Sequence, residues 1–406
     1  MKDLCERKIK YRRFLWTVLF LSILGTIGVC LKFARQRIPD EVHIYKNRQT
    51  DWEAIFDDPL IDYEILLETS QNGGYQVNCR WMGLLPLKTV KVSLIEENYL
   101  YVSGTPIGIY METNGVMIAG CGEFLNQEGN VCTPAKDILQ PGDYIQSING
   151  IQLESKKHLV QLLKTANGEP MKMEILREKQ PVSLMVTPEK TEEGEYKLGI
   201  WVRDNIQGVG TLTFLDEEGN FGALGHGISD MDTGMQMDIS GGKLYCAKIV
   251  SIKKGAAGQP GELQGVIDYS ELFKMGEIIS NTPFGIGGRA KGDYRNHIHR
   301  ELCPIALKQE IHTGKAELMC DIGEGVKKYA VTITKLNWNM EETNKSFVIE
   351  ITDSRLLQET GGIVQGMSGS PILQDGKLVG AVTHVLVNDP TRGYGIFIEN
   401  MLETTE

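Results

Sequence analysis

Residues 196–406 form a succession of short β-like runs separated by turns rich in Gly and Pro. Such turns recur at 253–261 and 281–292, and few stretches show the 3.6-residue apolar period of a helix. Short strands at close intervals must bury one face against other strands, in a sandwich or a barrel. The pattern therefore favours a pair of β-barrels, with an active site in the cleft between them.

An uncharged apolar run occupies residues 14–31, near the N-terminus. It is long enough to span a bilayer, and basic residues that include Lys10, Arg12 and Arg13 precede it. The positive-inside rule then keeps the N-terminus cytoplasmic and exports everything after Lys32. A cleavable signal peptide is the alternative, but no small-x-small cleavage pattern follows the run. We expect a cytoplasmic tail at 1–13, a transmembrane anchor at 14–32 and a juxtamembrane stalk at 33–89.

Residues 90–188 carry the pattern of a PDZ domain of the bacterial protease type. Strand-like runs lead to the turns Pro141-Gly142-Asp143 and Asn149-Gly150, and a helix follows with Leu159 and Leu163 on one face. Such domains add an extended peptide to a sheet edge and hold its terminal carboxylate in a loop of backbone amides. For this chain we expect that loop at Ile107, Gly108 and Ile109.

A serine lies between glycines in Gly366-Met367-Ser368-Gly369, just before a hairpin that turns at Asp375-Gly376. Glycines let the backbone turn sharply and let a substrate carbonyl approach. The amides of Gly366 and Ser368 could together form an oxyanion hole. The simpler interpretation is a Gly-Ser turn without chemistry, because turns are rich in both residues.

A nucleophilic serine needs a base, usually a histidine oriented by a carboxylate. His226 also lies between glycines, at the end of an apolar segment. Asp268 and Asp353 both come after strand-like runs between His226 and Ser368, and spacing does not choose between them. His384, inside a strand-like run after the serine, is interpreted as sheet packing or as part of a pocket wall.

Long and unusual motifs then set this chain apart from a generic serine hydrolase. They lie at residues 222–233, 351–353, 361–371, 380–385 and 388–391. With the apolar N-terminal run and the PDZ-like segment in the same order, the whole chain resembles the sporulation stage IV protein B serine peptidases, peptidase family S55.

The resemblance implies a mainly β protein with an N-terminal transmembrane helix, a PDZ domain (α+β) and a chymotrypsin-like double β-barrel serine peptidase domain at 189–406. It implies Ser368 as nucleophile, His226 as general base and Asp353 as the orienting acid. In the usual chymotrypsin-like layout the aspartate lies nearer the histidine in sequence, where Asp268 is found, so Asp268 stays the rival. No cofactor is implied.

The resemblance also implies a biological role. Relatives cleave themselves in the juxtamembrane region and act on a membrane complex that restrains an intramembrane metalloprotease, which processes a sigma factor during endospore formation. Peptide or protein substrates, the chain's own N-terminal region, that complex and the membrane are the expected partners. The catalytic part would lie between the forespore and mother-cell membranes, and self-cleavage would release it.

Composition excludes other classes of function. A net charge of −11 gives no basic excess to neutralise phosphates, which argues against nucleic acid as a partner. His297 and His299 have no further Cys or His at metal-ligand spacing, so no metal is expected. Two alternatives remain: a catalytically silent PDZ adaptor, and a general envelope quality-control protease. The latter usually has its protease domain before its PDZ domain.

Overall fold

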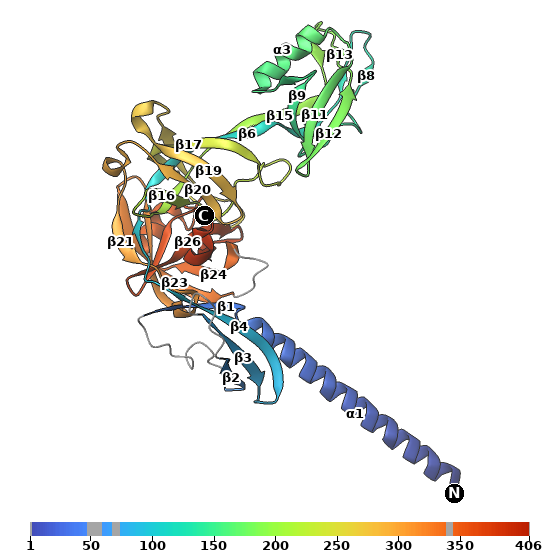
Figure 1. The fold of residues 1–406 in the computed structure, drawn as a ribbon, viewed down its shortest axis with the longest axis vertical. Helices are drawn as coiled ribbons and strands as arrows, with labels where there is room; N and C mark the ends of the chain where they lie inside the picture. The colour runs from blue at the N-terminus through green and yellow to red at the C-terminus, as the bar shows by residue number, and fades with distance from the viewer. Residues whose placement is uncertain (1, 47–58, 67–73, 338–343, 406) are drawn as a thin grey trace. The chain divides into compact units, whose positions relative to one another are not determined.

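The computed structural model describes residues 2–46, 59–66, 74–337 and 344–405 (Figure 1). These residues form two compact units. The first holds residues 1–98 and 307–312, with a short piece at 337–342, and the second holds the remainder. Each is described by itself below.

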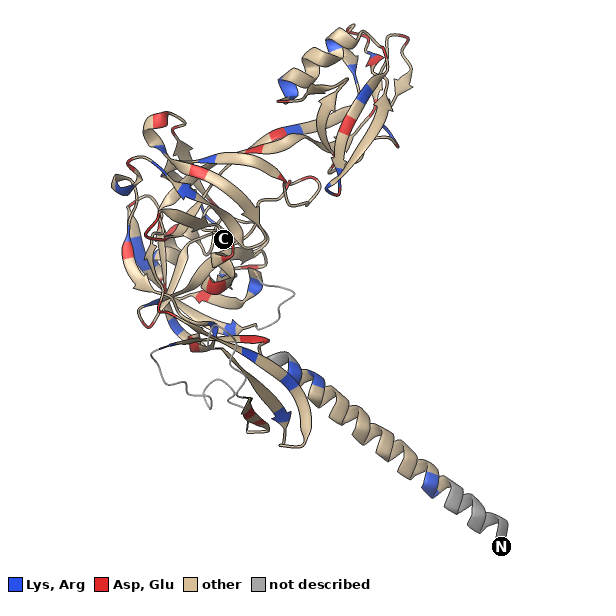
Figure 2. Ribbon diagram, viewed as in Figure 1, with Lys and Arg blue, Asp and Glu red and all other residues tan. Residues whose placement is uncertain are grey.

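The first unit begins with one long helix, α1 (Lys2–Arg37). Its segment Tyr11–Arg35 has a mean hydropathy of 2.3, so it is long and apolar enough to cross a membrane. Figure 2 shows no charged residue along the middle of this segment. The apolar side chains there are exposed, as those of a helix that faces lipid would be.

A four-stranded sheet follows the helix, in the region where the sequence predicted a juxtamembrane stalk. Its strands are β1 (Glu41–Tyr45), β2 (Ile61–Leu66), β3 (Tyr75–Trp81) and β4 (Leu85–Ile95). The spatial order is β1-β4-β3-β2, and β1 pairs with β4 in parallel. Alternate residues such as Val77, Val90 and Val92 form its core. The parts of the expected stalk at 47–58 and 67–73 lie outside the described residues.

The second unit contains two six-stranded barrels. The first barrel is formed by β6 (Pro106–Cys121), β15 (Ile200–Leu215), β16 (Asn220–Ala223), β17 (Ile239–Lys253), β19 (Lys274–Thr282) and β20 (Gly285–Ala290). Pairing runs β6-β17-β19-β20-β16-β15, and a ladder between β15 and β6 closes the ring. The strands β5 (Tyr99–Val102), β18 (Glu262–Ile267) and β21 (Glu301–Pro304) extend the same sheet, and the short helices η1 (Glu271–Phe273) and η2 (Tyr294–Asn296) lie in its loops.

The second barrel is closed in the order β22-β23-β24-β27-β26-β25. Its elements are β22 (Gly314–Asp321), β23 (Val326–Leu336), β24 (Phe347–Ile351), α4 (Ser354–Thr360), β25 (Pro371–Gln374), β26 (Lys377–Leu386), β27 (Asp389–Phe397) and α5 (Ile398–Leu402). The short helix η3 (Lys308–Glu310) precedes it and belongs to the first unit. The two barrels confirm the expected trypsin-like architecture.

The PDZ domain is built between two long strands of the first barrel. It contains the far end of β6, the strands β9 (Tyr144–Ile148), β10 (Ile151–Gln152), β11 (Met171–Arg177) and β12 (Gln180–Val186), helix α3 (Lys156–Ala166) and the start of β15. Two small hairpins, β7 (Phe124–Leu125) with β8 (Val131–Cys132) and β13 (Glu189–Lys190) with β14 (Tyr196–Lys197), complete it. The hydroxyl of Ser155 caps α3 by accepting from the His158 amide, and Leu159 and Leu163 enter the core.

This arrangement changes the boundary between the two domains. The near end of β6 pairs with β15 on one side and β17 on the other, so it belongs to the barrel. Residues 99–112, expected within the PDZ domain, are therefore part of the peptidase scaffold. The one turn signal along this 16-residue strand is Asn114-Gly115, with Gly115 at φ +91°, and the sequence analysis placed the boundary well before it.

Candidate active site

Ser368 lies in the loop between α4 and β25, and both barrels hold this loop. The Gly369 amide donates to the Val382 carbonyl (2.8 Å), and the Thr211 amide of the first barrel donates to the Ser368 carbonyl (3.0 Å). Gly369 has φ +91°, and a Cβ there would lie 2.2 Å from the Thr211 carbonyl oxygen. Only glycine fits at this position, which gives the Gly-Met-Ser-Gly motif a structural reason.

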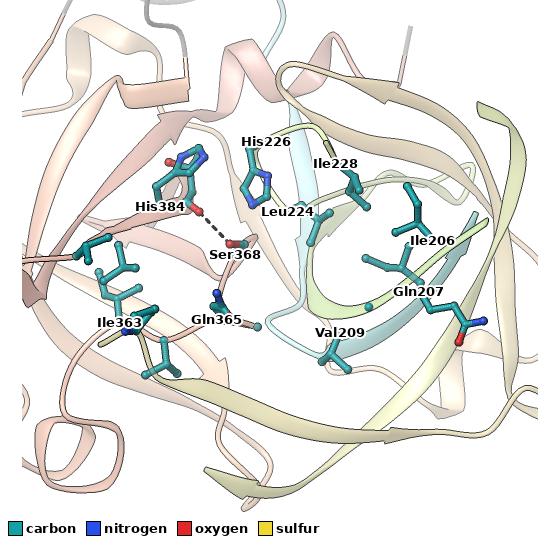
Figure 3. Close-up of a pocket in the computed structure, with 18 residues that line it drawn as sticks. Ile206, Gln207, Val209, Leu224, His226, Ile228, Ile363, Gln365, Ser368 and His384 are labelled. Carbon is teal, nitrogen blue, oxygen red and sulfur yellow. Dashed lines mark hydrogen bonds between the residues drawn. The ribbon is translucent and has the colours of Figure 1, made fainter. Parts of the chain in front are cut away.

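His226 is carried by the loop that follows β16 of the first barrel. Leu224 and Gly225 both have φ +71°, and this turn brings the imidazole to the cleft. Its Nδ1 lies 2.9 Å from the Gly227 carbonyl oxygen. Because a carbonyl only accepts, Nδ1 carries the proton and Nε2 keeps its lone pair. Figure 3 shows the His226 ring beside Ser368.

Burial lowers the pKa of His226 below its ordinary value, and the hydrogen bond to Gly227 offsets only part of that effect. A neutral imidazole is the form that can accept a proton. We predict that the acid limb of the pH profile for kcat/KM lies below pH 6.5, because protonation of His226 is disfavoured in the folded enzyme. A pH–rate profile measured with a peptide substrate checks this, and a midpoint at or above pH 6.5 would contradict it.

The hydroxyl of Ser368 donates to the carbonyl oxygen of Thr383 at 2.9 Å. No hydrogen bond joins Ser368 to His226 in the described residues, so the serine is in a resting rotamer. Catalytic hydrogen bonds are often absent until substrate binds, and rotation about one side-chain bond would redirect the hydroxyl. The two side chains line one cavity of about 490 Å³.

Two backbone amides near Ser368 are available for an oxyanion. The amides of Gly366 and Ser368 have no hydrogen-bond acceptor within the part of the chain that the structure describes. The Gln365 carbonyl accepts from the Leu263 amide (2.8 Å), so the Gly366 N–H of that trans peptide points away from β18. This is the orientation that an oxyanion hole needs.

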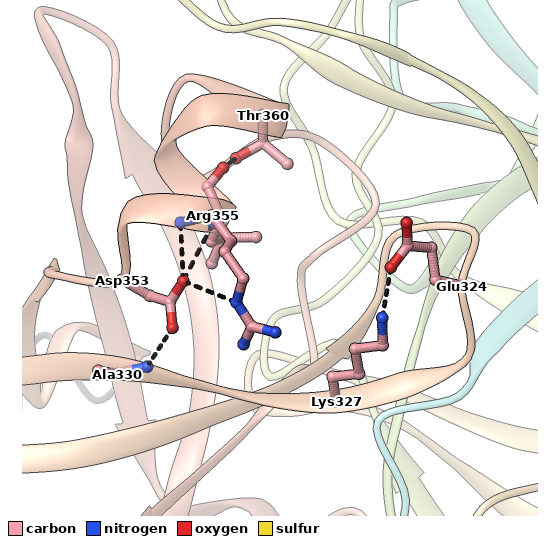
Figure 4. Close-up of polar contacts among 7 residues, drawn as sticks. Glu324, Lys327, Ala330, Asp353, Arg355 and Thr360 are labelled. Carbon is pink, nitrogen blue, oxygen red and sulfur yellow. Dashed lines mark hydrogen bonds and ion pairs between the residues drawn. The ribbon is translucent and has the colours of Figure 1, made fainter.

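The structure does not bring Asp353 to His226. Asp353 is the N-cap of α4, where its carboxylate accepts from the amides of Arg355 (2.9 Å) and Leu356 (3.2 Å) and from that of Ala330 (3.4 Å) (Figure 4). It lines a different cavity, between β22, β23 and β25. Burial raises the pKa of Asp353, but the three amides and Arg355 outweigh it and hold the pKa below its usual value.

Asp268, the rival, has no contact with the histidine among the described residues either. It is exposed in the turn after β18, where its carboxylate accepts from the Ser270 amide at 2.9 Å. Neither aspartate lines the cavity of Ser368 and His226. The group that orients the imidazole in this conformation is the carbonyl of Gly227.

Exchanging Asp353 separates a capping role from a catalytic one. Asn and Asp cap helices about equally well, whereas Ala costs about 1 kcal/mol of stability. From this geometry we predict that Asp353→Asn keeps kcat within about tenfold and that Asp353→Ala loses stability by about that amount. Loss of a triad carboxylate would instead reduce kcat by about 10⁴ while the fold stays intact. Denaturant unfolding and peptidase rates for both variants decide between these outcomes.

His384 is a neighbour of the site that the sequence assigned only to packing or a pocket wall. Its ring centroid lies 4.8 Å from that of His226, with the rings tilted by 34°. Loss of hydration, with contributions from His226 and Lys345, lowers the pKa of His384 to about 4. At neutral pH the two rings are therefore both uncharged and do not repel each other.

The structure corrects the expected position of the carboxylate-binding loop of the PDZ domain. Ile107, Gly108 and Ile109 are barrel residues, paired with 208–210 of β15 on one side and 244–246 of β17 on the other. Ile107 and Ile109 are also fully buried. With both strand edges occupied, this segment has no free amides for a peptide carboxylate.

A segment that the sequence analysis overlooked has the required features. Gly199, with φ +68°, precedes the start of β15, whose residues 200–203 pair with β6 on one edge. The opposite edge has no strand partner among the described residues. Ile200 and Val202 pack against the core that contains Leu159 and Leu163 of α3. A strand edge beside a helix is the geometry that binds an added peptide strand.

Comparisons with known proteins agree with this architecture. A family model described as SpoIVB peptidase S55 matches residues 194–402, and a PDZ-domain model matches residues 132–177. A search of curated proteins finds no match.

Solved structures are similar only at a distance. The PDZ domain of an SdrC-like protein from Listeria monocytogenes is 19% identical, covers 22% of this chain and 87% of its own, and has a TM-score of 0.18. The HtrA-type protease AlgW with a decapeptide is 11% identical, with 75% of this chain and 64% of that chain covered and a TM-score of 0.31. The match to the S55 model, in contrast, spans more than half of the residues. The chain therefore belongs to the SpoIVB peptidase S55 family of serine peptidases.

Proposed function

We propose that this chain is a membrane-anchored serine endopeptidase in which Ser368 is the nucleophile and His226 the general base. The observation that supports these roles best is the convergence, in one cavity, of a glycine-flanked serine, a neutral imidazole with a free Nε2, and two amides without acceptors. These are the parts that acyl transfer to a serine requires.

The reaction proceeds in two balanced steps. Ser368 Oγ bonds to the substrate carbonyl carbon while His226 Nε2 takes the hydroxyl proton, and the amides of Gly366 and Ser368 stabilise the oxyanion. His226 then returns the proton to the leaving amine as the peptide bond breaks. Water attacks the resulting acyl-enzyme with His226 again as base, and the acid product leaves with Ser368 restored.

The group that orients His226 is where this proposal departs from the family assignment. The resemblance predicts Asp353 as the orienting acid, and the Asp353→Asn variant described above tests that prediction against the capping role. The Gly227 carbonyl fits the role because it fixes the tautomer, although it carries no full charge to stabilise an imidazolium.

The biological setting belongs to the proposal. With the apolar N-terminal helix as an anchor and basic residues before it, the peptidase would lie on the exported side, between the forespore and mother-cell membranes. There it would cleave itself within 33–89 and relieve the inhibition of an intramembrane metalloprotease. The edge of β15 beside α3 would hold the peptide that regulates this step.

Reconstitution of the full chain in liposomes tests the anchored peptidase. We expect a soluble fragment whose new N-terminus, read by mass spectrometry, lies between residues 33 and 89. A chain that stays intact, or one that is cut only outside that range, would contradict the proposal of self-release. In a spore-forming host, a strain that carries only the Ser368→Ala variant should accumulate the unprocessed sigma factor.

A further inference from the structure

The cavity beside Ser368 has an apolar lobe formed mainly by the second barrel. Its walls are Ile363, Val364, Val385 and Val387, with Pro260 from the loop between β17 and β18, hereafter the Ile363 lobe. Figure 3 shows Ile363 on the far side of Ser368 from Ile206 and Ile228, which belong to the first-barrel wall. Ile363 and Val364 are each only 2% exposed, whereas Val387 is 52% exposed at the rim. The lobe therefore has a buried base and an open mouth.

The base of this lobe depends on a glycine. A Cβ at Gly393 of β27 would lie 2.5 Å from Ile363 Cδ1 and 2.7 Å from the His384 carbonyl oxygen. Any larger residue at 393 would collide with the Ile363 side chain. The side chain of Ile363 thus has a fixed position from which it can meet a ligand.

A free strand edge leads to the lobe. β26 pairs with β25 at Gly380 and Ala381, and the Val382 carbonyl accepts from the Gly369 amide at 2.8 Å. From His384 to Leu386, β26 has a strand partner only on the β27 side within the described residues. An extended peptide can add to the other edge, with its carbonyl next to Ser368 and alternate side chains directed to pockets.

The chemistry of the walls selects what can enter. Among the described residues that line the cavity, none is Asp, Glu, Lys or Arg. A charged side chain in the lobe would lose its hydration and gain no counter-charge, whereas an aliphatic or aromatic one would bury its surface.

We propose that this peptidase selects bonds preceded by an apolar residue, which the Ile363 lobe receives, and that Ile363 is the main specificity-determining residue. This inference rests on the proposed function of Ser368. It assigns to the enzyme a substrate class, namely extended segments with Leu, Ile, Val, Met or Phe before the cleaved bond.

A series of peptides tests the selection directly. The peptides are identical except for Leu, Phe, Ala, Lys or Asp at one position, and kcat/KM is measured with the full chain in detergent. Hydrolysis of p-nitrophenyl acetate is measured in parallel, because its acetyl group reports acylation without filling the lobe. We expect the Leu and Phe peptides to exceed the Lys and Asp peptides by at least about tenfold.

Two variants assign the preference to the lobe. Ile363→Ala enlarges the base and should raise the Phe-to-Leu ratio. Val387→Glu lies at the exposed rim, where folding is not at risk, and should raise the Lys-to-Leu ratio by up to about fivefold. Val250→Glu is the matched control, since Val250 is 60% exposed on β17 and does not line the cavity. It should leave every ratio unchanged.

The outcomes separate this inference from the proposed function. One outcome is that ester hydrolysis requires Ser368 while all peptides are cleaved at equal rates, or the Lys or Asp peptide is preferred. This outcome overturns the lobe assignment but not the proposed peptidase function. An apolar preference that neither Ile363→Ala nor Val387→Glu alters overturns the role of these residues. Absence of both ester and peptide hydrolysis overturns the proposed function itself.

Discussion

Ser368→Ala should abolish proteolysis without unfolding the protein. Loss of the nucleophile removes the covalent route, and in serine peptidases this reduces kcat on the order of 10⁶-fold. The hydroxyl makes a single hydrogen bond, to the Thr383 carbonyl, so its removal costs only about 1 kcal/mol of stability. Peptide hydrolysis, with circular dichroism and thermal unfolding alongside, measures both effects.

Ser370→Ala is the matched control for this experiment. Ser370 lies two residues further along the same loop and is completely buried, 3.5 Å from the Thr211 hydroxyl oxygen. Its loss should reduce stability by a similar amount and leave most of the activity. If Ser368→Ala were as active as Ser370→Ala, Ser368 would not be the nucleophile.

Gly369→Ala should cause the largest structural change, because this glycine has no room for a side chain. A Cβ would lie 2.2 Å from the Thr211 carbonyl oxygen and 2.5 Å from the Leu224 amide nitrogen, and φ is +91°. Positive φ costs about 1–2 kcal/mol for an L-residue, and overpacking adds about 1–3 kcal/mol. We expect a loss of about 2–5 kcal/mol in the free energy of unfolding, together with nearly all activity, because the loop that carries Ser368 must move.

Gly376→Ala separates crowding from backbone strain. Gly376 also has a positive φ, +76°, but a Cβ there would meet nothing within 4 Å. Its exchange should cost only about 1–2 kcal/mol and should not affect kcat. Equal stability losses in the two variants would mean that contact with the first barrel does not hold the serine loop in place.

The sequence predicted the parts of the site that local backbone geometry dictates. Ser368 and His226 both lie in turns that require neighbouring glycines, and this requirement is visible in the sequence as a motif. Other parts of the site have no sequence signal: the cavity, the Gly227 carbonyl and the pairing of Gln365 with β18. Backbone carbonyls and amides occur at almost every position, so their roles cannot be recognised from residue type. An aspartate that caps a helix and one that orients a histidine also look alike in a single sequence, so the position of Asp353 required the structure.

The sequence predicted the fold in outline but did not predict all of the domain boundaries. Alternating strands and Gly-rich turns indicated two barrels, and the PDZ turns and helix were located. The Ile107-Gly108-Ile109 segment and the one around Gly199 share an apolar-Gly-Ile pattern, so pattern alone could not tell a barrel strand from a peptide-binding loop. Strand pairing between residues far apart in the sequence, such as Ile200 with Cys121 and Gly210 with Ile107, decides between them, and such pairing cannot be read from spacing.

The most direct test of the proposed active site is covalent labelling with a fluorophosphonate, followed by mass spectrometry of the labelled peptide. The proposed site predicts one adduct, on Ser368, at a rate that falls by orders of magnitude in the His226→Ala variant while the fold is unchanged. An adduct on another serine, no adduct on the folded wild type, or equal labelling of His226→Ala would contradict the claim that His226 activates Ser368 in this cavity.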